Sequence, residues 1–167
     1  MLKLSQRHEL QQDLKEKAEN DLAHIIPALK KEPIVKDMFK KYKRDINDID
    51  GVSIQFAPLD VSAKTINGEI FLNEEMLKDN WKDYFQYLPH ELTHYLQHTS
   101  GKCAEDQKDE PYLDQPAEIE AFKNQLQYKE KTEDATTVNR YLRDLFDKHE
   151  IPKDERKEKK KELLGEK

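Results

Sequence analysis

The chain carries, at residues 90–94, the sequence His90-Glu91-Leu92-Thr93-His94. Residues four positions apart lie one above the other on one face of an α-helix, so two imidazoles at this spacing can bind one metal ion. Glu91 is rotated by about 100° from His90 around such a helix, which places its carboxylate beside the ion, where it can take a proton from water. The pattern predicts a helical metal site with His90 and His94 as ligands and Glu91 as the catalytic base.

The same helix carries a second set of side chains at helical spacing, which predicts its buried face: Leu88, Leu92, Tyr95, Leu96 and Thr99. The two histidines are therefore expected at the edge of the buried surface. His98 continues the histidine series, but a straight helix places it about 12 Å along the axis from His90. One ion cannot be shared over that distance, so we expect His98 at the rim of the site or behind a ligand.

The third ligand is predicted on a helix that begins near Pro116. Three apolar residues define the buried side of that helix, namely Ile119, Phe122 and Leu126. Glu118 lies about 60° from the centre of this stripe and Glu120 about 140° from it, so Glu118 leans inward and Glu120 faces water. A carboxylate that leans into a core needs a partner, which favours Glu118 as the ligand, with Asp114 and Glu120 in reserve. Alternatively, Glu118 only interacts with the positive N-terminus of its helix.

The segments His90–Gln97 and Glu118–Ala121 resemble the gluzincin branch of the HExxH zincin metallopeptidases, and most of all small metallopeptidases of bacteria and their phages. In that branch the third ligand is a glutamate on a second helix, usually with a small residue three positions later, and Glu118 with Ala121 matches this. The family often has an aspartate at the next position, which supports a ligand histidine. This chain has Phe122 there, so the support must come from elsewhere.

Apolar periodicity predicts helices over residues 5–30 and 34–42, strands over 52–57 and roughly 64–73, a helix from Asn80 to Thr99, a loop over 102–115 and further helices from Pro116 onward. Pro27 should kink or end the first helix. Asn67-Gly68 predicts a hairpin turn. Pro89 either kinks its helix or lies in the first turn of a new one. The tail from Lys153 is expected to be a solvated or frayed helix, with Leu163-Leu164 as its apolar anchor.

These elements predict an α+β fold that is mostly helical. The resemblance covers roughly residues 50–128 and implies a zincin-like core, with a small β-sheet before the HExxH helix and flanking N- and C-terminal helices. We expect one globular domain in three parts: N-terminal helices packed on the core (1–50), the core itself (51–150) and a charged C-terminal tail (151–167). The resemblance also implies that an edge strand pairs with the extended substrate. Gly68–Asn73 lies at the right place in chain order, with a purely structural hairpin as the alternative.

The composition limits the classes of binding partner and the cellular compartment that we expect. The chain has 35 acidic and 29 basic residues, a net charge of −6, which argues against binding nucleic acid through overall charge. The N-terminus has no signal-peptide-like apolar stretch, and no run approaches the roughly 20 apolar residues of a membrane span. Cys103 is the single cysteine, so no internal disulfide can form. We expect a cytoplasmic protein, of bacteria or phage-infected cells. Cys103 is either a loop thiol or a fourth zinc ligand that holds the enzyme latent.

The sequence thus predicts a zinc metallopeptidase that hydrolyses peptide bonds with a zinc-activated water and Glu91 as general base. Its partner is a protein or peptide substrate, with no nucleic acid and no membrane. The candidates for stabilising the oxyanion are His98, Tyr95, Tyr112 and His149, of which His98 and Tyr112 are preferred. One alternative is a zincin-fold binding module that keeps zinc without useful turnover. Another is a helical structural or interaction protein without metal.

Overall fold

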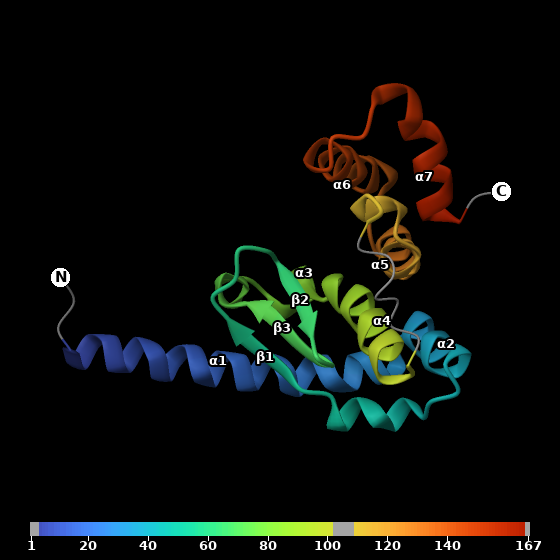
Figure 1. Cartoon of the computed structure of the whole chain (residues 1–167). Helices are drawn as coiled ribbons and strands as arrows, with labels where there is room; N and C mark the ends of the chain where they lie inside the picture. The colour runs from blue at the N-terminus through green and yellow to red at the C-terminus, as the bar shows by residue number, and fades with distance from the viewer. Residues whose placement is uncertain (1–3, 102–108, 166–167) are drawn as a thin grey trace. The chain divides into compact units, whose positions relative to one another are not determined.

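The computed structural model describes residues 4–101 and 109–165, with side chains from residue 11 onward. The chain forms two compact units, Met1–Phe85 and Gln86–Lys167 (Figure 1). The boundary between them lies inside the segment 51–150, which we expected to be one core. The described residues are mostly helical and include a small sheet, so the predicted α+β, mostly helical class is confirmed.

The first unit contains α1 (Leu4–Lys31), α2 (Pro33–Lys41), the 3-10 helix η1 (Ile46–Gly51), the strands β1 (Ile54–Ala57), β2 (Ala63–Ile66) and β3 (Glu69–Asn73), the 3-10 helix η2 (Glu74–Lys78) and α3 (Trp81–Tyr84). Helix α1 continues through Pro27 as far as Lys31, so the alternative that Pro27 ends the helix is wrong. Pro33 is the first residue of α2, where a backbone N–H would have no acceptor within the helix, so the N–H that proline lacks is not needed. The fully buried or nearly buried side chains of these two helices include Ile25, Leu29, Val35 and Phe39.

The described strands form a three-stranded sheet in the order β1-β3-β2. β2 and β3 are an antiparallel hairpin whose turn residues, Asn67 and Gly68, have φ of 52° and 79°, which confirms the predicted turn. β1 pairs with β3 in parallel, with Ile54 opposite Ile70. Since β3 is the central strand, the expectation that Gly68–Asn73 offers a free edge to a substrate is wrong. The edge strands are β1 and β2.

The second unit contains α4 (Tyr87–Thr99), the 3-10 helix η4 (Tyr112–Asp114), α5 (Pro116–Thr132), α6 (Ala135–Lys148), the 3-10 helix η5 (Lys153–Glu155) and α7 (Arg156–Leu164). Pro89 lies in the first turn of α4, which confirms that a new helix begins there. A cluster of buried apolar side chains joins η4, α5, α6 and α7, namely Leu113, Phe122, Leu126, Val138, Leu142, Phe146 and Leu163.

The C-terminal helix α7 is packed rather than frayed. Leu163 is completely buried and Leu164 packs against the same cluster, so this pair is the anchor that the sequence predicts. Lys159 Nζ donates to the main-chain oxygen of Leu113 (3.0 Å) and to the Asp114 carboxylate (2.6 Å). Helix α7 therefore holds η4, the segment that leads into α5.

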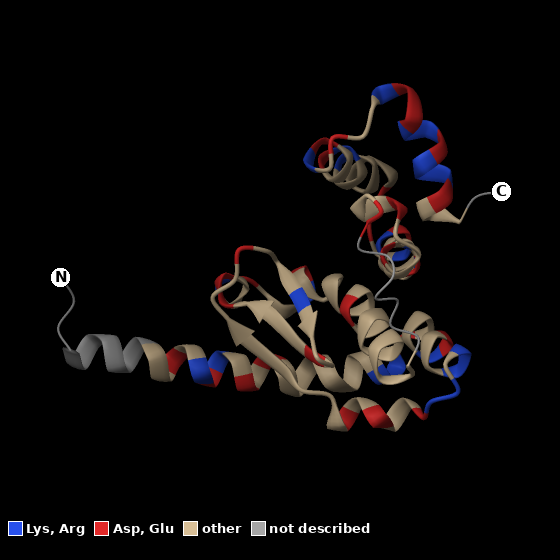
Figure 2. Cartoon of the chain, viewed as in Figure 1, with Lys and Arg blue, Asp and Glu red and all other residues tan. Residues whose placement is uncertain are grey.

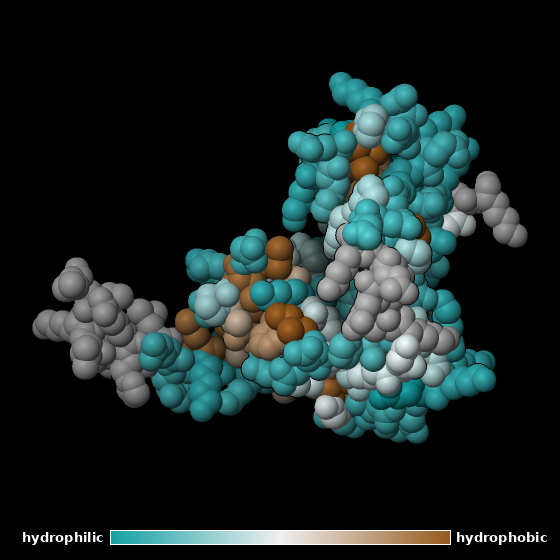
Figure 3. Space-filling model, viewed as in Figure 1, coloured by the Kyte–Doolittle hydropathy of each residue, from teal (hydrophilic) through white to brown (hydrophobic). Residues whose placement is uncertain are grey.

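Charged residues are prominent along α7, whereas apolar residues reach the surface over the sheet. Figure 2 shows basic and acidic residues interspersed along α7. Figure 3 shows apolar residues at the surface over the sheet of the first unit, where Ile66 is 43% exposed. Leu14, Leu22 and Phe56 line a groove of about 370 Å³ in the same unit.

Within the part of the chain that the structure describes, no helix combines the length and the apolar character needed to cross a bilayer.

Candidate metal site

Helix α4 presents His90 and His94 one turn apart, with their Nε2 atoms 3.2 Å from each other. The core face of the helix is formed by fully buried leucines, namely Leu88, Leu92 and Leu96. His90 is only 7% exposed, so it lies inside the buried surface and not at its edge as expected. Thr99, expected on the core face, is exposed, and Tyr95 is half-buried.

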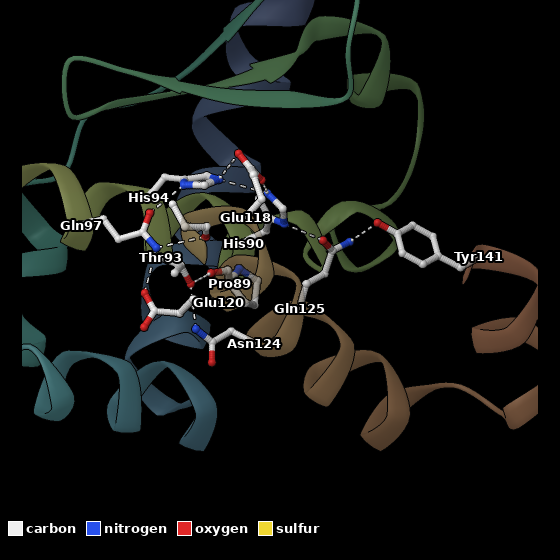
Figure 4. A network of polar contacts seen from close by, with 11 residues as sticks. Pro89, His90, Thr93, His94, Gln97, Glu118, Glu120, Asn124, Gln125 and Tyr141 are labelled. Atoms are coloured by element: carbon white, nitrogen blue, oxygen red, sulfur yellow. Dashed lines mark hydrogen bonds and ion pairs between the residues drawn. The ribbon is translucent and has the colours of Figure 1, made fainter. Parts of the chain in front are cut away.

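Glu118 completes the group from the first turn of α5. Its Oε1 lies 3.1 Å from His94 Nε2, and its Oε2 lies 3.2 Å from His90 Nε2. Each of the three residues offers one ligand atom, and these atoms all lie within 4.8 Å of one another (Figure 4). The structure thus brings together the three residues that the sequence singled out as ligands.

The two reserve ligands lie elsewhere. Asp114 is exposed and pairs with Lys159. Glu120 is half-buried rather than directed to water, and its Oε1 accepts a hydrogen bond from Gln97 Nε2 (2.8 Å). Among the described residues, only the cluster around Glu118 could hold a metal ion.

Both histidines contact a glutamine on the side away from Glu118. Gln97 Oε1 lies 2.9 Å from His94 Nδ1, and Gln125 Oε1 lies 3.0 Å from His90 Nδ1. A neutral imidazole that donates from Nδ1 keeps its lone pair on Nε2. Both lone pairs therefore face the Glu118 carboxylate.

The gluzincin branch that the sequence resembles often has an aspartate at position 122, where this chain has an aromatic ring. Phe122 packs edge-on against His90, with 4.5 Å between ring centroids. The support for His90 comes instead from Gln125, seven residues or about two helical turns after Glu118 on α5. Sequence reasoning missed Gln125 and Gln97, because an amide side chain on a helix carries no distinctive signal.

The residues present fit a metal ion. Two imidazole nitrogens and one carboxylate oxygen form a donor set that leaves a fourth tetrahedral position open. Glu118 Oε2 is buried, and no hydrogen-bond donor of the described residues outside the two imidazoles reaches it. Three electron-pair donors converge there, and such a donor set could hold a cation.

The pKa values of Glu118 and His94 are both shifted by the contact between the two side chains. Burial raises the pKa of Glu118, but hydrogen bonds and charge from His90 and His94 outweigh burial and hold this pKa well below its ordinary value. Burial lowers the pKa of His94, but Glu118, helped by Glu91 and Gln97, raises it above its ordinary value. Both shifts follow from the close approach of His94 and Glu118, each of which stabilises the charged form of the other.

Glu91 is buried beside the cluster, at 6% exposure, and is not one of the converging ligands. Its charge contributes to raising the pKa of both His94 and Tyr112, so it acts on both groups. Glu91 thus lies close to the three converging side chains without being one of them.

Tyr112 is the better placed of the two preferred oxyanion candidates. Its ring stacks on His149, with 4.6 Å between centroids. Tyr112 is 38% exposed, but partial burial of its hydroxyl, together with the charge of Glu118 and a hydrogen bond to it, raises the tyrosine pKa, so the hydroxyl stays protonated. His98 is exposed at the end of α4 and is not part of the cluster. Cys103 lies outside the described residues.

Comparison with protein families, with curated proteins and with solved structures finds no match to this chain. The chemistry of the cluster therefore rests on its own geometry.

Proposed function

We propose that the chain is a zinc-dependent metallopeptidase of the zincin type, which hydrolyses peptide bonds in a protein or peptide substrate. The observation that carries the proposal is the convergence of His90 Nε2, His94 Nε2 and the Glu118 carboxylate, with all three contacts at 3.1–3.2 Å. Two nitrogen ligands favour zinc over calcium and magnesium, which prefer oxygen ligands alone.

The proposed chemistry is shared by five side chains and the ion: the three ligands, Glu91 and Tyr112. Zinc bound by His90, His94 and Glu118 would lower the pKa of a water molecule towards neutrality and would polarise a carbonyl group. Glu91 takes the proton of the attacking water and passes it to the leaving amine. Tyr112 donates a hydrogen bond to the oxygen on which negative charge develops. The buried position of Glu91 keeps its proton from bulk solvent between the two transfers.

Metal content of purified variants tests the site. We expect about one zinc per chain in the wild type by elemental analysis, and loss of zinc in His94→Ala and Glu118→Ala. His98→Ala is the matched control, because His98 is an exposed histidine on the same helix, and it should keep its zinc. Glu91→Gln should also keep zinc but lose hydrolysis of a fluorogenic peptide mixture.

The outcomes separate the proposed function from its alternatives. Zinc in the wild type without hydrolysis of any peptide would favour a zincin-fold binding module. A wild type that binds no zinc, even when zinc is supplied, would overturn the proposal and leave a helical structural or interaction protein.

A further inference from the structure

The two ligand histidines are each held by an uncharged amide. The contacts are Gln97 Oε1 to His94 Nδ1 (2.9 Å) and Gln125 Oε1 to His90 Nδ1 (3.0 Å). Gln97 and Gln125 are 6% and 1% exposed, so water cannot easily replace either contact. A metal-ligating histidine is ordinarily oriented by a partner at its second nitrogen, often a carboxylate. Here both partners are neutral.

The orientation of Gln97 follows from its other contacts. Its Nε2 donates to the main-chain oxygen of Ala117 (3.1 Å) and to Glu120 Oε1 (2.8 Å), and both of these atoms can only accept. The carbonyl end of the amide must therefore face His94. Gln97 links a ligand on α4 to the backbone of α5 directly before Glu118, the third ligand.

Gln125 belongs to a second chain of contacts. Its Nε2 lies 3.0 Å from the Tyr141 hydroxyl, and Lys129 Nζ lies over the Tyr141 ring, 4.4 Å from the centroid. Lys129 is itself buried and pairs with Glu133 at 2.9 Å. From His90 the contacts run through the Gln125 amide to the Tyr141 phenol. From His94 they run through the Gln97 amide to the Glu120 carboxylate.

We propose that Gln97 and Gln125 are positioning residues, which fix the ring orientation and tautomer of His94 and His90 so that both Nε2 atoms face the metal. This inference rests on the proposed metal site. It assigns to Gln97 the further task of setting the distance between α4 and the start of α5, and hence between His94 and Glu118.

The two positions differ in what they tolerate. A carboxylate at position 97 could accept from His94, but it could not donate to Ala117 and would face the charge of Glu120. A carboxylate at position 125 meets no such conflict, because the Tyr141 hydroxyl can donate to it as readily as it accepts from the amide. Glutamate is therefore expected to fail at one position and to succeed at the other.

Zinc affinity, measured by competition with a chromophoric chelator, tests the assignment without any need for a substrate. We expect Gln97→Leu and Gln125→Leu each to bind zinc about 10–100-fold more weakly than the wild type. Gln97→Glu should also bind weakly, and the exchange Gln97→Glu with Glu120→Gln should recover most of the loss, since an amide at 120 can donate to the new carboxylate. Gln125→Glu should bind at least as tightly as the wild type.

The control distinguishes a metal-directed role from packing of the two helices. Asn124 Nδ2 donates to Thr93 Oγ1 (2.9 Å), a contact that also joins α5 to α4 but touches neither histidine. Asn124→Leu should leave zinc affinity unchanged. The absorption bands of the cobalt-loaded protein should change in Gln97→Leu and Gln125→Leu but not in Asn124→Leu.

The failures of the two proposals look different. A wild type that binds no zinc refutes the metal site itself. A wild type that binds zinc, with both leucine variants matching Asn124→Leu, overturns the positioning role and leaves the metal site intact. Full affinity in Gln97→Glu alone would overturn the need for an amide at that position.

Discussion

At the scale of single residues, the hydroxyl of Tyr112 is the group whose removal is most informative about turnover. We expect Tyr112→Phe to lower kcat by about 10²-fold, because one hydrogen bond to the developing oxyanion is lost. Zinc content should be unchanged, since the three ligands remain. The measurement is kcat for a cleaved peptide beside elemental analysis of the same sample.

His149 supplies the control for this substitution. It stacks on Tyr112 but is not part of the ligand cluster, so His149→Ala should affect kcat much less than Tyr112→Phe does. Equal kcat in Tyr112→Phe and the wild type would show that another donor serves the oxyanion.

The sequence predicts residues of the site when their chemistry is distinctive. His90 and His94 stand at a spacing that few other roles require, and the helical angle of Glu118 separates it from Glu120. The glutamines were not predicted, because an amide side chain is common on solvated helices and has no charge whose burial would demand a partner. Only the packing of α5 on α4 shows that Gln97 and Gln125 face the histidines.

At the scale of elements, the start of α6 should depend on pH through its cap. Asp134 Oδ1 accepts a hydrogen bond from the Thr137 backbone N–H (2.7 Å), and hydrogen bonds with the side chain and the backbone of Thr137 hold the pKa of Asp134 below its ordinary value of 3.8. A folded-state pKa below the unfolded one stabilises the protein above the unfolded pKa, and this contribution is lost as pH falls through the folded pKa.

Thermal unfolding of the wild type, Asp134→Ala and Asp134→Asn at several pH values tests this direction of the pH dependence. Asp134→Ala should unfold at a lower temperature than the wild type near neutral pH, and the difference in melting temperature should shrink in acid. Asp134→Asn keeps an acceptor for Thr137 without a titrating group, so it should lie nearer the wild type and show less change with pH. A difference between the wild type and Asp134→Ala that grows in acid would contradict the capping role.

The anchoring of α7 gives a second prediction for an element. Leu163→Ala should lower the free energy of unfolding by about 2–5 kcal/mol, because it leaves a cavity in the cluster that joins α5, α6 and α7. Urea denaturation followed by circular dichroism measures this loss. Lys157→Ala, an exposed position on the same helix, should change stability by less than about 0.5 kcal/mol. A loss no larger at 163 than at 157 would mean that α7 contributes little to the fold.

Local elements were predictable, whereas their pairing was not. The turn at Asn67-Gly68 was recognisable because both residues accept positive φ, and two neighbouring strands then pair by proximity. In the parallel pairing of β1 with β3, Ile54 lies opposite Ile70, although β2 separates the two strands in the chain. No periodicity encodes that partnership, and the expectation that Gly68–Asn73 is an edge strand rested on the resemblance and on chain order. Pro27 does not end its helix, since the burial of Ile25 and Leu29 favours a continuous helix over the local cost of a proline.

At the scale of the whole molecule, all three ligands and both supporting glutamines lie in the unit Gln86–Lys167. The unit Met1–Phe85 has its own buried polar contact, in which the Tyr84 hydroxyl donates to Asp21 (2.5 Å). Metal bound only by the folded state adds stability to whatever unfolds together with the site, by about 2.7 kcal/mol at a hundredfold excess over Kd. If zinc stabilises only the unit Gln86–Lys167, the two units unfold separately; if it stabilises both equally, they unfold together.

Hydrogen exchange measured by mass spectrometry, with zinc and with a chelator, makes the distinction. If the units open independently, zinc should slow the exchange of amides in α4 and α5 and leave those of β1 and β3 unchanged, because added stability reaches only the cooperative unit that holds the ligands. His94→Ala should show no zinc effect in either unit. Slowing of equal size in β3 and α4 would mean that the two units unfold as one, and no slowing anywhere in the wild type would count against the metal site.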